Sequence, residues 1–252
     1  MSSRSACGAV LMVAALVPSA VPGQDTPPEP TVEQLNKARK DYAKVGATYR
    51  AETDPLTKRF AHSFEFASGT RDADLKNLPN PPFPFTLELS FTQVTDEGLM
   101  GLKGLRNLTT LSLGSTRVTD EGLKELKDLR NLTSLNLAFT EVTDAGLKEL
   151  KDLKNLTSLY LSGTQVTDAG LKQLREIGLL HALSRATAKD GKRPTGPEDI
   201  TTLDLNGTKV TDAGLKELKD LRNLTALELP AAVTDAGLKE LKEALPNCRI
   251  SK

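Results

Sequence analysis

The sequence predicts an α/β fold, a right-handed solenoid of stacked strand-and-helix units with a parallel inner sheet and outer helices. The tripeptide Val-Thr-Asp recurs along the chain, and alternating leucines precede each copy. Leucines at three-residue spacing follow each copy. The copies begin at Val94, Val118, Val142, Val166, Val210 and Val233. Self-similarity of this period is typical of repeat architectures.

The period itself is regular, with one large interruption. The first three steps between copies are 24 residues, the fourth is 44 and the fifth is 23. The 44-residue step equals one period plus a 20-residue insertion. We place this insertion at about residues 176–200. Because the pattern resumes afterwards, we expect one array rather than two domains.

One unit, residues 107–130, contains two secondary-structure periods. Two leucines alternate with small or polar residues, which predicts a short strand with one buried face. Three more follow at three-residue spacing and predict a helix of about ten residues with one apolar stripe. The strand leucines are Leu111 and Leu113, and the helix leucines are Leu123, Leu126 and Leu129.

The start of each helix carries its own signals. Either Thr119 or Asp120 supplies the oxygen that caps the helix, and the aspartate also favours its positive end. Gly122 recurs in every copy, and we interpret it as a position where a side chain would hold the helix away from the strand layer.

Units this short cannot bury their leucines without neighbours on both flanks, so the ends need covering. Residues 64–86 match the repeat offsets and form a degenerate first repeat, which gives a repeat domain over 64–252. Residues 24–63 are interpreted as a linker and capping helix, with the helix over Thr31–Tyr49. Residues 248–252 look like one more strand, cut short.

The first residues have the pattern of a secretory signal peptide, 1–23. Arg4 precedes an apolar run over Ala6–Val17, which is too short to span a bilayer. Cleavage is expected after Gly23, with Ala20 as the alternative. We therefore expect an exported chain without a transmembrane anchor.

After cleavage, Cys248 would be the only cysteine, so no intramolecular disulfide can form. Cys248 is interpreted as a small buried hydrophobe. The alternative is a surface thiol that links two chains.

Charge and histidine content exclude several functions. Lys+Arg and Asp+Glu both number 33, so no global field favours nucleic acid or an anionic membrane. His62 and His181 are the only histidines, and several repeats separate them. Neither a zinc site nor a catalytic triad can be built from them. We expect no enzyme activity, no metal and no cofactor.

The pattern Leu-x-x-Leu-x-Leu-x-x-Thr-x-Val-Thr-Asp-x-Gly-Leu-x-x-Leu, intact over Leu108–Leu126, resembles leucine-rich repeats. It is most similar to the cysteine-containing type of F-box proteins, with Thr in place of Cys or Asn. The Leu-Pro-x-Cys motif at Leu245–Cys248 resembles the ends of exported bacterial members. The resemblance implies a curved array that binds proteins on its concave face. No F-box is recognisable, and the signal peptide argues against a ubiquitin-ligase role.

Two rows of side chains are predicted to face the concave side. The row between the two strand leucines contains Glu88, Ser112, Asn136, Tyr160, Asp204 and Glu228. The row after them contains Ser90, Gly114, Ala138, Ser162, Asn206 and Pro230. Both rows are small and polar at their centre.

Three aromatic residues, Phe91, Phe139 and Tyr160, lie near this surface. Exposed aromatic side chains are enriched where partners dock, so these are candidate binding residues together with Asn136. The alternative is that Phe91 and Phe139 pack locally against the loops.

Asp204 and Glu228 are predicted to lie on adjacent strands, with Asn206 nearby. We include all three in the candidate partner-binding surface. Paired carboxylates could also hold calcium or act as acid and base, but a solvated acidic surface is favoured over both.

The insertion is the second candidate binding region, since loops that interrupt a repeat often carry function. Leu171 to about Ala188 reads as a prolonged helix, and residues 189–197 read as an exposed loop. Lys192 and Arg193 in this loop could pair with an acidic partner. The alternative is an insertion that is merely tolerated.

These observations favour an exported interaction module that binds a protein or a glycan through its concave face and the 189–197 loop. The alternative is a structural spacer that packs against copies of itself in an envelope assembly.

Overall fold

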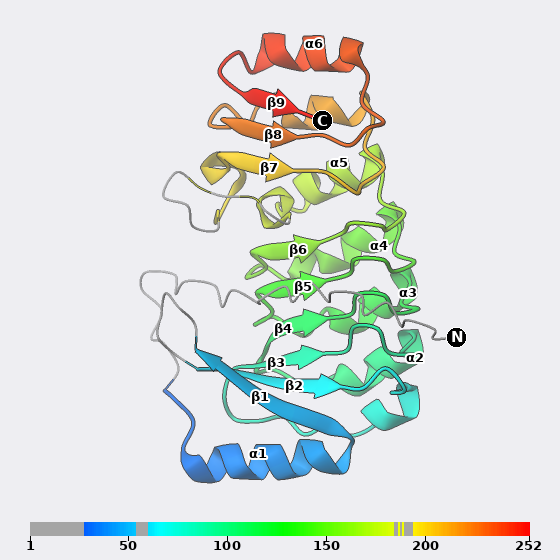
Figure 1. Cartoon of the computed structure of the whole chain (residues 1–252), viewed down its shortest axis with the longest axis vertical. Helices are drawn as coiled ribbons and strands as arrows, with labels where there is room; N and C mark the ends of the chain where they lie inside the picture. Colours follow the sequence, from blue (N-terminus) through cyan, green and yellow to red (C-terminus); the bar gives the residue numbers. More distant parts are fainter. Residues whose placement is uncertain (1–27, 54–59, 184–185, 187, 189–193) are drawn as a thin grey trace, which may run out of the picture.

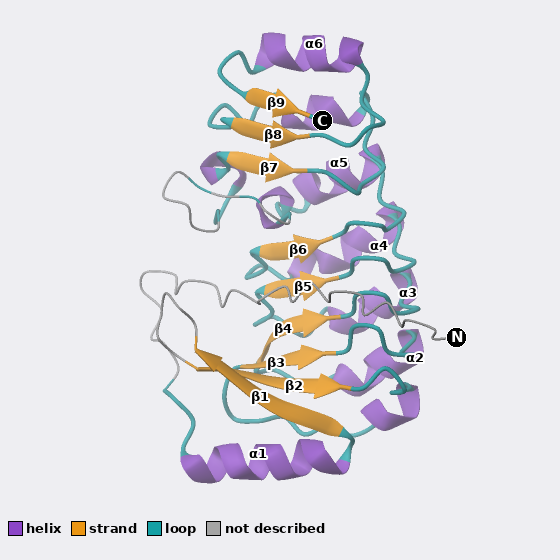
Figure 2. Ribbon diagram, viewed as in Figure 1, coloured by secondary structure: helices purple, strands orange, loops and turns teal. Residues whose placement is uncertain are grey.

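The chain folds into a solenoid whose strands line one side and whose helices line the other (Figure 1, Figure 2). The computed structural model describes residues 28–53, 60–183, 186, 188 and 194–252. The signal peptide expected over 1–23 falls outside the described residues, as do the candidate binding residues Lys192 and Arg193. Within the described ranges no helix has the length and apolar character needed to cross a bilayer. The predicted α/β solenoid is confirmed.

The first sheet has six strands in chain order. They are β1 Ala47–Thr53, β2 Phe60–Phe66, β3 Phe85–Glu88, β4 Leu108–Ser112, β5 Ser134–Asn136 and β6 Ser158–Tyr160. Strands β2 to β6 are parallel, and equivalent repeat positions lie in register, for example Leu87, Leu111 and Leu135. Strand β1 runs antiparallel to β2.

A helix and this antiparallel strand cover the first repeat. The helix, α1 Val32–Lys44, begins with a capping box between Thr31 and Gln34. Its buried Tyr42 stacks on Phe64 of β2, with ring centroids 3.8 Å apart. The helix expected as far as Tyr49 ends earlier, because Gly46 takes a positive φ of 83° and the chain then turns into β1.

In most repeats the outer helix is shorter than the ten-residue helix predicted. Single α-helical turns form α2 Asp96–Leu99, α3 Asp120–Leu123 and α4 Asp144–Leu147. Each continues as a 3-10 turn, over Met100–Leu102, Lys124–Leu126 and Lys148–Asp152. Leucines spaced by three residues match the three-residue period of the 3-10 helix. The repeat helices α5 Asp168–Glu176 and α6 Asp235–Ala244 are longer, with nine and ten residues.

The helix cap is the threonine, and the aspartate has another role. Thr119 caps α3 by accepting a hydrogen bond from the backbone N–H of Glu121. The Asp120 carboxylate instead accepts the backbone N–H and the hydroxyl of Thr143 in the next repeat, at 2.8 and 2.6 Å. We call this series the aspartate ladder. Its pairs are Asp72–Thr95, Asp96–Thr119, Asp120–Thr143, Asp144–Thr167, Asp168–Thr211 and Asp212–Thr234.

The aspartate ladder also explains the recurring glycine. A Cβ atom at Gly122 would lie 2.4 Å from the Asp96 carboxylate of the preceding repeat. We expected a side chain at this position to strike the strand layer, and this was wrong, because it would strike the aspartate of the preceding repeat. The glycine makes room for the aspartate that ties the repeats together.

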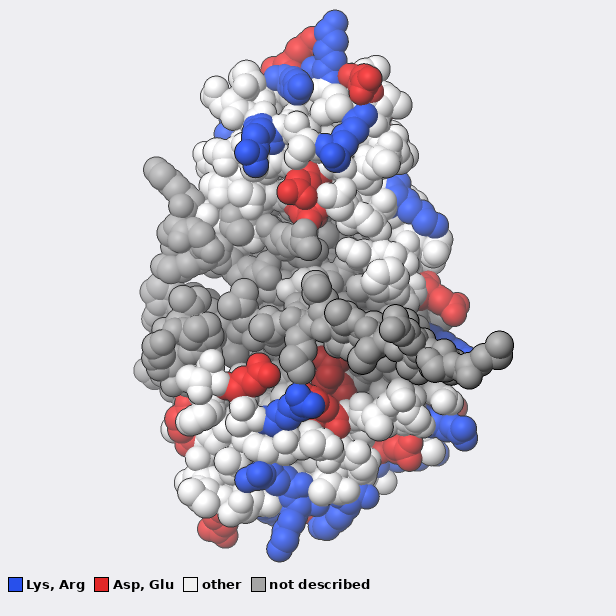
Figure 3. All heavy atoms as spheres, in the orientation of Figure 1, with Lys and Arg blue, Asp and Glu red and all other residues white. Residues whose placement is uncertain are grey.

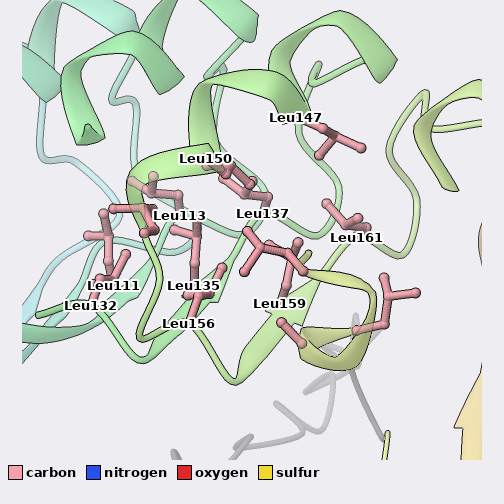
Figure 4. Packing of buried hydrophobic residues seen from close by; sticks show 14 of the residues in the cluster. Leu111, Leu113, Leu132, Leu135, Leu137, Leu147, Leu150, Leu156, Leu159 and Leu161 are labelled. Atoms are coloured by element: carbon pink, nitrogen blue, oxygen red, sulfur yellow. The ribbon is translucent and has the colours of Figure 1, made fainter. Parts of the chain in front are cut away.

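The core is a stack of aliphatic side chains between the strands and the outer turns (Figure 4). In one repeat seven of these side chains are at most 1% exposed: Leu108, Leu111, Leu113, Val118, Leu123, Leu126 and Leu129. Equivalent leucines of the next repeats continue the stack, so each repeat covers its neighbour.

The insertion divides the predicted single inner sheet into two. Strands β7 Thr202–Asp204, β8 Ala226–Glu228 and β9 Arg249–Ser251 form a separate parallel sheet. Where the next strand would pair with β6, the bridge runs instead from Leu159 to Leu183 of the insertion. On the loop side the repeats stay joined, since Gly163 donates to the Gly207 carbonyl at 2.8 Å.

The insertion does not form the prolonged helix predicted as far as Ala188. Helix α5 ends at Glu176, and Gly178 has a positive φ of 77°, a conformation that commonly terminates helices. A 3-10 turn over Leu180–Ala182 follows, and a further one spans Pro197–Asp199. Leu179 and Leu183 are buried, so the insertion adds to the core.

At the C-terminal end Cys248 is 8% exposed, and burial raises the pKa of its thiol. This is the buried small side chain expected from the sequence. The alternative of a surface thiol does not fit this burial.

Candidate partner-binding face

The side chains that alternate with the buried leucines on the strands form the inner face. The predicted row is brought together in two groups, one on each sheet. In register lie Glu88, Ser112, Asn136 and Tyr160 on the first sheet, and Asp204 and Glu228 on the second. Tyr160 is half-buried and sits beside Asn136, whereas the second group begins beyond the insertion.

Some polar side chains of this row have a local structural role that sequence reasoning missed. Each accepts a hydrogen bond from the backbone N–H two residues later and so satisfies a donor at the end of its strand. The pairs are Glu88 with Ser90 (3.0 Å), Asn136 with Ala138 (3.0 Å) and Asp204 with Asn206 (2.8 Å). This local role accounts in part for the polar residues at Asn136 and Asp204, without any partner protein.

Phe91 and Phe139 are the exposed aromatic residues of the inner rim. They are 64% and 67% exposed, so neither is buried, although the Phe139 ring packs locally over Gly163 as the alternative expected. Both have positive φ, 62° and 58°. A bulky residue in this left-handed conformation costs about 1–2 kcal/mol.

These phenylalanines belong to one repeat position that is left-handed in the five repeats from β3 to β7. We call it the left-handed column, and it contains Phe91, Ser115, Phe139, Gly163 and Gly207. The ring of Phe139 lies over Gly163, where a Cβ atom would be 2.4 Å from the ring. Large and small residues thus alternate from β3 to β6, and two rings project from the column two repeats apart.

The inner face near β2 and β3 is acidic. Glu65 of β2, which sequence reasoning missed, lies in register with Glu88. Burial raises the pKa of Glu65, and the negative charges of Glu88 and Glu52 raise it further. Arg50 of β1 opposes this shift through an ion pair with Glu65 at 2.8 Å. In Figure 3, which shows this side of the molecule, acidic side chains gather around a basic one in the lower half.

The degenerate first repeat contained the signal for Glu65. It lies between Phe64 and Phe66, as Glu88 lies between Leu87 and Leu89. Extending the concave row by one repeat would have found it.

On the second sheet, Asn206 donates its side-chain amide to the Glu228 carboxylate at 3.2 Å. Asp204 is paired in register with Glu228, as predicted. In the parts of the chain described, no group of three or more His, Cys, Asp or Glu side chains could hold a metal ion. The arrangement is that of a hydrogen-bonded polar surface.

The two histidines lie in different parts of the solenoid and have different surroundings. His62 in β2 shares a 2.8 Å hydrogen bond with the Tyr49 hydroxyl. His181 lies in the insertion and is 5% exposed. Burial is the largest cause that lowers the pKa of each.

Taken together, the geometry defines a solenoid of strand-and-helix repeats with a polar inner face and an aromatic rim. A family model described as "Leucine Rich repeats (2 copies)" matches residues 130–175. A second, described as "Leucine Rich repeat", matches residues 86–103, 104–127 and 198–219. The chain therefore contains leucine-rich repeats.

Two solved structures from Listeria monocytogenes are similar to this chain. An internalin (inlF) is 19% identical over 68% of this chain and 47% of its own, with a TM-score of 0.47. An internalin C2 is 22% identical over 75% of this chain and 80% of its own, with a TM-score of 0.43. This chain thus aligns with less than half the length of the inlF structure. Among curated proteins, none matches the sequence.

Proposed function

We propose that the protein is an exported binding scaffold that holds a partner protein against its inner face, anchored on Phe91 and Phe139. The export part rests on the signal-peptide pattern of residues 1–23. The binding part rests on one observation. Two phenylalanine rings stand exposed at a position whose conformation favours glycine, and strained residues held in place often serve function.

Substitution at this position should weaken partner binding while leaving the free energy of unfolding almost unchanged. We expect the double variant Phe91→Gly/Phe139→Gly to keep its free energy of unfolding within about 1 kcal/mol. Relief of left-handed strain opposes the entropy that glycine adds to the unfolded chain. Loss of two aromatic anchors should weaken partner binding about tenfold or more.

The measurement is cross-linking of the tagged protein on its host cells, followed by quantitative mass spectrometry and thermal denaturation. Met100→Ala is the matched control, because Met100 is 57% exposed and lies on the outer side. Equal recovery of partners by the double variant would remove the site. Recovery of the protein's own chain alone would support the self-assembling spacer instead.

A further inference from the structure

Glu88 is the one carboxylate of the β3–β6 inner face. One of its oxygens accepts the backbone N–H of Ser90, which places the carboxylate beside the residue that precedes Phe91. The side chain is half-buried, and among the described residues no cation pairs with it. Within the described residues this partly desolvated carboxylate therefore has no charge partner, and it lies at the strand end that leads into the exposed Phe91.

The neighbouring strands do not supply that partner. Residues of β2 to β6 include no lysine or arginine. Arg50 of β1 is engaged with Glu65, the register neighbour of Glu88. Glu52 on β1 adds a further negative charge that raises the pKa of Glu65. The charges of Arg50 and Glu65 cancel in their ion pair. The carboxylates of Glu88 and Glu52 therefore leave this end of the face negative.

We propose that Glu88 and Phe91 together bind an arginine-containing, apolar segment of the partner protein. A guanidinium group can donate two hydrogen bonds to a carboxylate and also lie against an aromatic ring, which suits it to this pair. Apolar side chains of the same segment would contact Phe139, two repeats further along the left-handed column. This assignment rests on the proposed function and adds the chemistry of the partner to it.

The test uses random twelve-residue peptides displayed on phage, selected on the purified full chain and counter-selected on Phe91→Gly/Phe139→Gly. Affinities of the selected peptides, made synthetically, are then measured by fluorescence anisotropy for the wild type, Glu88→Gln and Glu97→Gln. Glutamine keeps an oxygen that can accept the Ser90 N–H and removes only the charge. Glu97 is an exposed carboxylate of α2 on the outer side and serves as the matched control.

We expect the selected peptides to be enriched in arginine beside apolar residues. Glu88→Gln should bind them about five- to tenfold more weakly, with less dependence on salt, and Glu97→Gln should bind as the wild type does. Peptides without this enrichment, or equal affinity of Glu88→Gln and wild type, would overturn the assignment while the proposed function stands. Failure to select any peptide that needs the phenylalanines would overturn both.

Discussion

One carboxylate in each repeat ties that repeat to the next. Asp120 accepts two hydrogen bonds from Thr143, and the same Thr143 caps the following helix. The recurring glycine leaves the space that this carboxylate occupies. The Val-Thr-Asp-x-Gly motif is therefore a connection between repeats rather than a property of one helix.

Adding a methyl group at this glycine should be costly. In Gly146→Ala the new Cβ would lie 2.3 Å from Asp120 Oδ1 and 3.1 Å from its Cα. The carboxylate would lose its two hydrogen bonds, and we expect a loss of about 2–4 kcal/mol in free energy of unfolding, measured by urea denaturation. Gly69→Ala is the control, because nothing lies within 4 Å of a Cβ there.

A double-mutant cycle sharpens this prediction. In the Asp120→Ala background the carboxylate is absent, so Gly146→Ala should cost much less than in the wild type. If the cost of Gly146→Ala were the same in both backgrounds, the aspartate would not be what the glycine accommodates.

The sequence was informative at the residue scale wherever a pattern repeated. The buried leucines and the alternating inner row follow from period and alternation alone. The partner of each aspartate lies 22 or 23 residues ahead, or 43 across the insertion, and no local pattern reports such a contact. The conformation of Phe91 was equally hidden, since a phenylalanine gives no local signal for positive φ.

Among the elements, the insertion departs most from the template. Its 3-10 turn over Leu180–Ala182 places His181 in the core between the two sheets, 5% exposed. Among the described residues, the Nδ1 atom of His181 has no hydrogen-bond partner. Burial lowers the pKa of His181, while the carbonyl groups of Gly178 and Leu156 and the carboxylates of Glu198 and Asp199 oppose this effect.

The lowered pKa predicts that the protein loses stability in mild acid. Below the unfolded value of about 6.5 the unfolded chain takes up a proton on this histidine and the folded chain does not. Stability should therefore fall as the pH drops from about 6.5 to the folded pKa, by at most about 1.4 kcal/mol per pH unit for this group. Urea midpoints at pH 7.5 and 5.5 measure the effect.

The stability of His181→Gln should fall less from pH 7.5 to pH 5.5 than that of the wild type. A residual dependence is expected from His62, whose pKa burial also lowers. His62→Gln is the matched variant, which should remove that residual part. An unchanged pH dependence in His181→Gln would show that this histidine is not the group that titrates.

Elements without a repeating pattern were predicted least well. Strand β1 has the sequence Ala-Thr-Tyr-Arg-Ala-Glu-Thr, with one buried residue, so its pairing with β2 decides its structure. The helices α2 to α4 are shorter than predicted for a related reason. Leucines at three-residue spacing suit a 3-10 turn as well as an α-helix, and neighbouring repeats select between them.

At the scale of the whole molecule, two sheets share one stack of repeats. The inner strand ladder breaks between β6 and β7, but the aspartate ladder continues from Asp168 to Thr211. Arg175 of α5 also reaches the Asp220 carboxylate of the next repeat at 2.5 Å. Contacts on the loop and helix side therefore couple the two halves across the insertion.

Loss of the ladder at this junction should uncouple the halves. In an array where each repeat contacts only its neighbours, cooperativity depends on every interface. Asp120→Ala and Asp168→Ala each remove the same two hydrogen bonds, worth about 1–3 kcal/mol. Asp120→Ala lies within the continuous sheet, so we expect one urea transition with a lower midpoint and an unchanged slope.

Asp168→Ala should instead give a broadened or two-step transition. Hydrogen exchange should show that β7 to β9 lose protection before β2 to β6 do, because their strands have no ladder to β6. A single transition of unchanged slope in Asp168→Ala would mean that the core packing of Leu179 and Leu183 couples the halves without the aspartate. In that case the insertion, rather than the ladder, would be the element that holds the solenoid together.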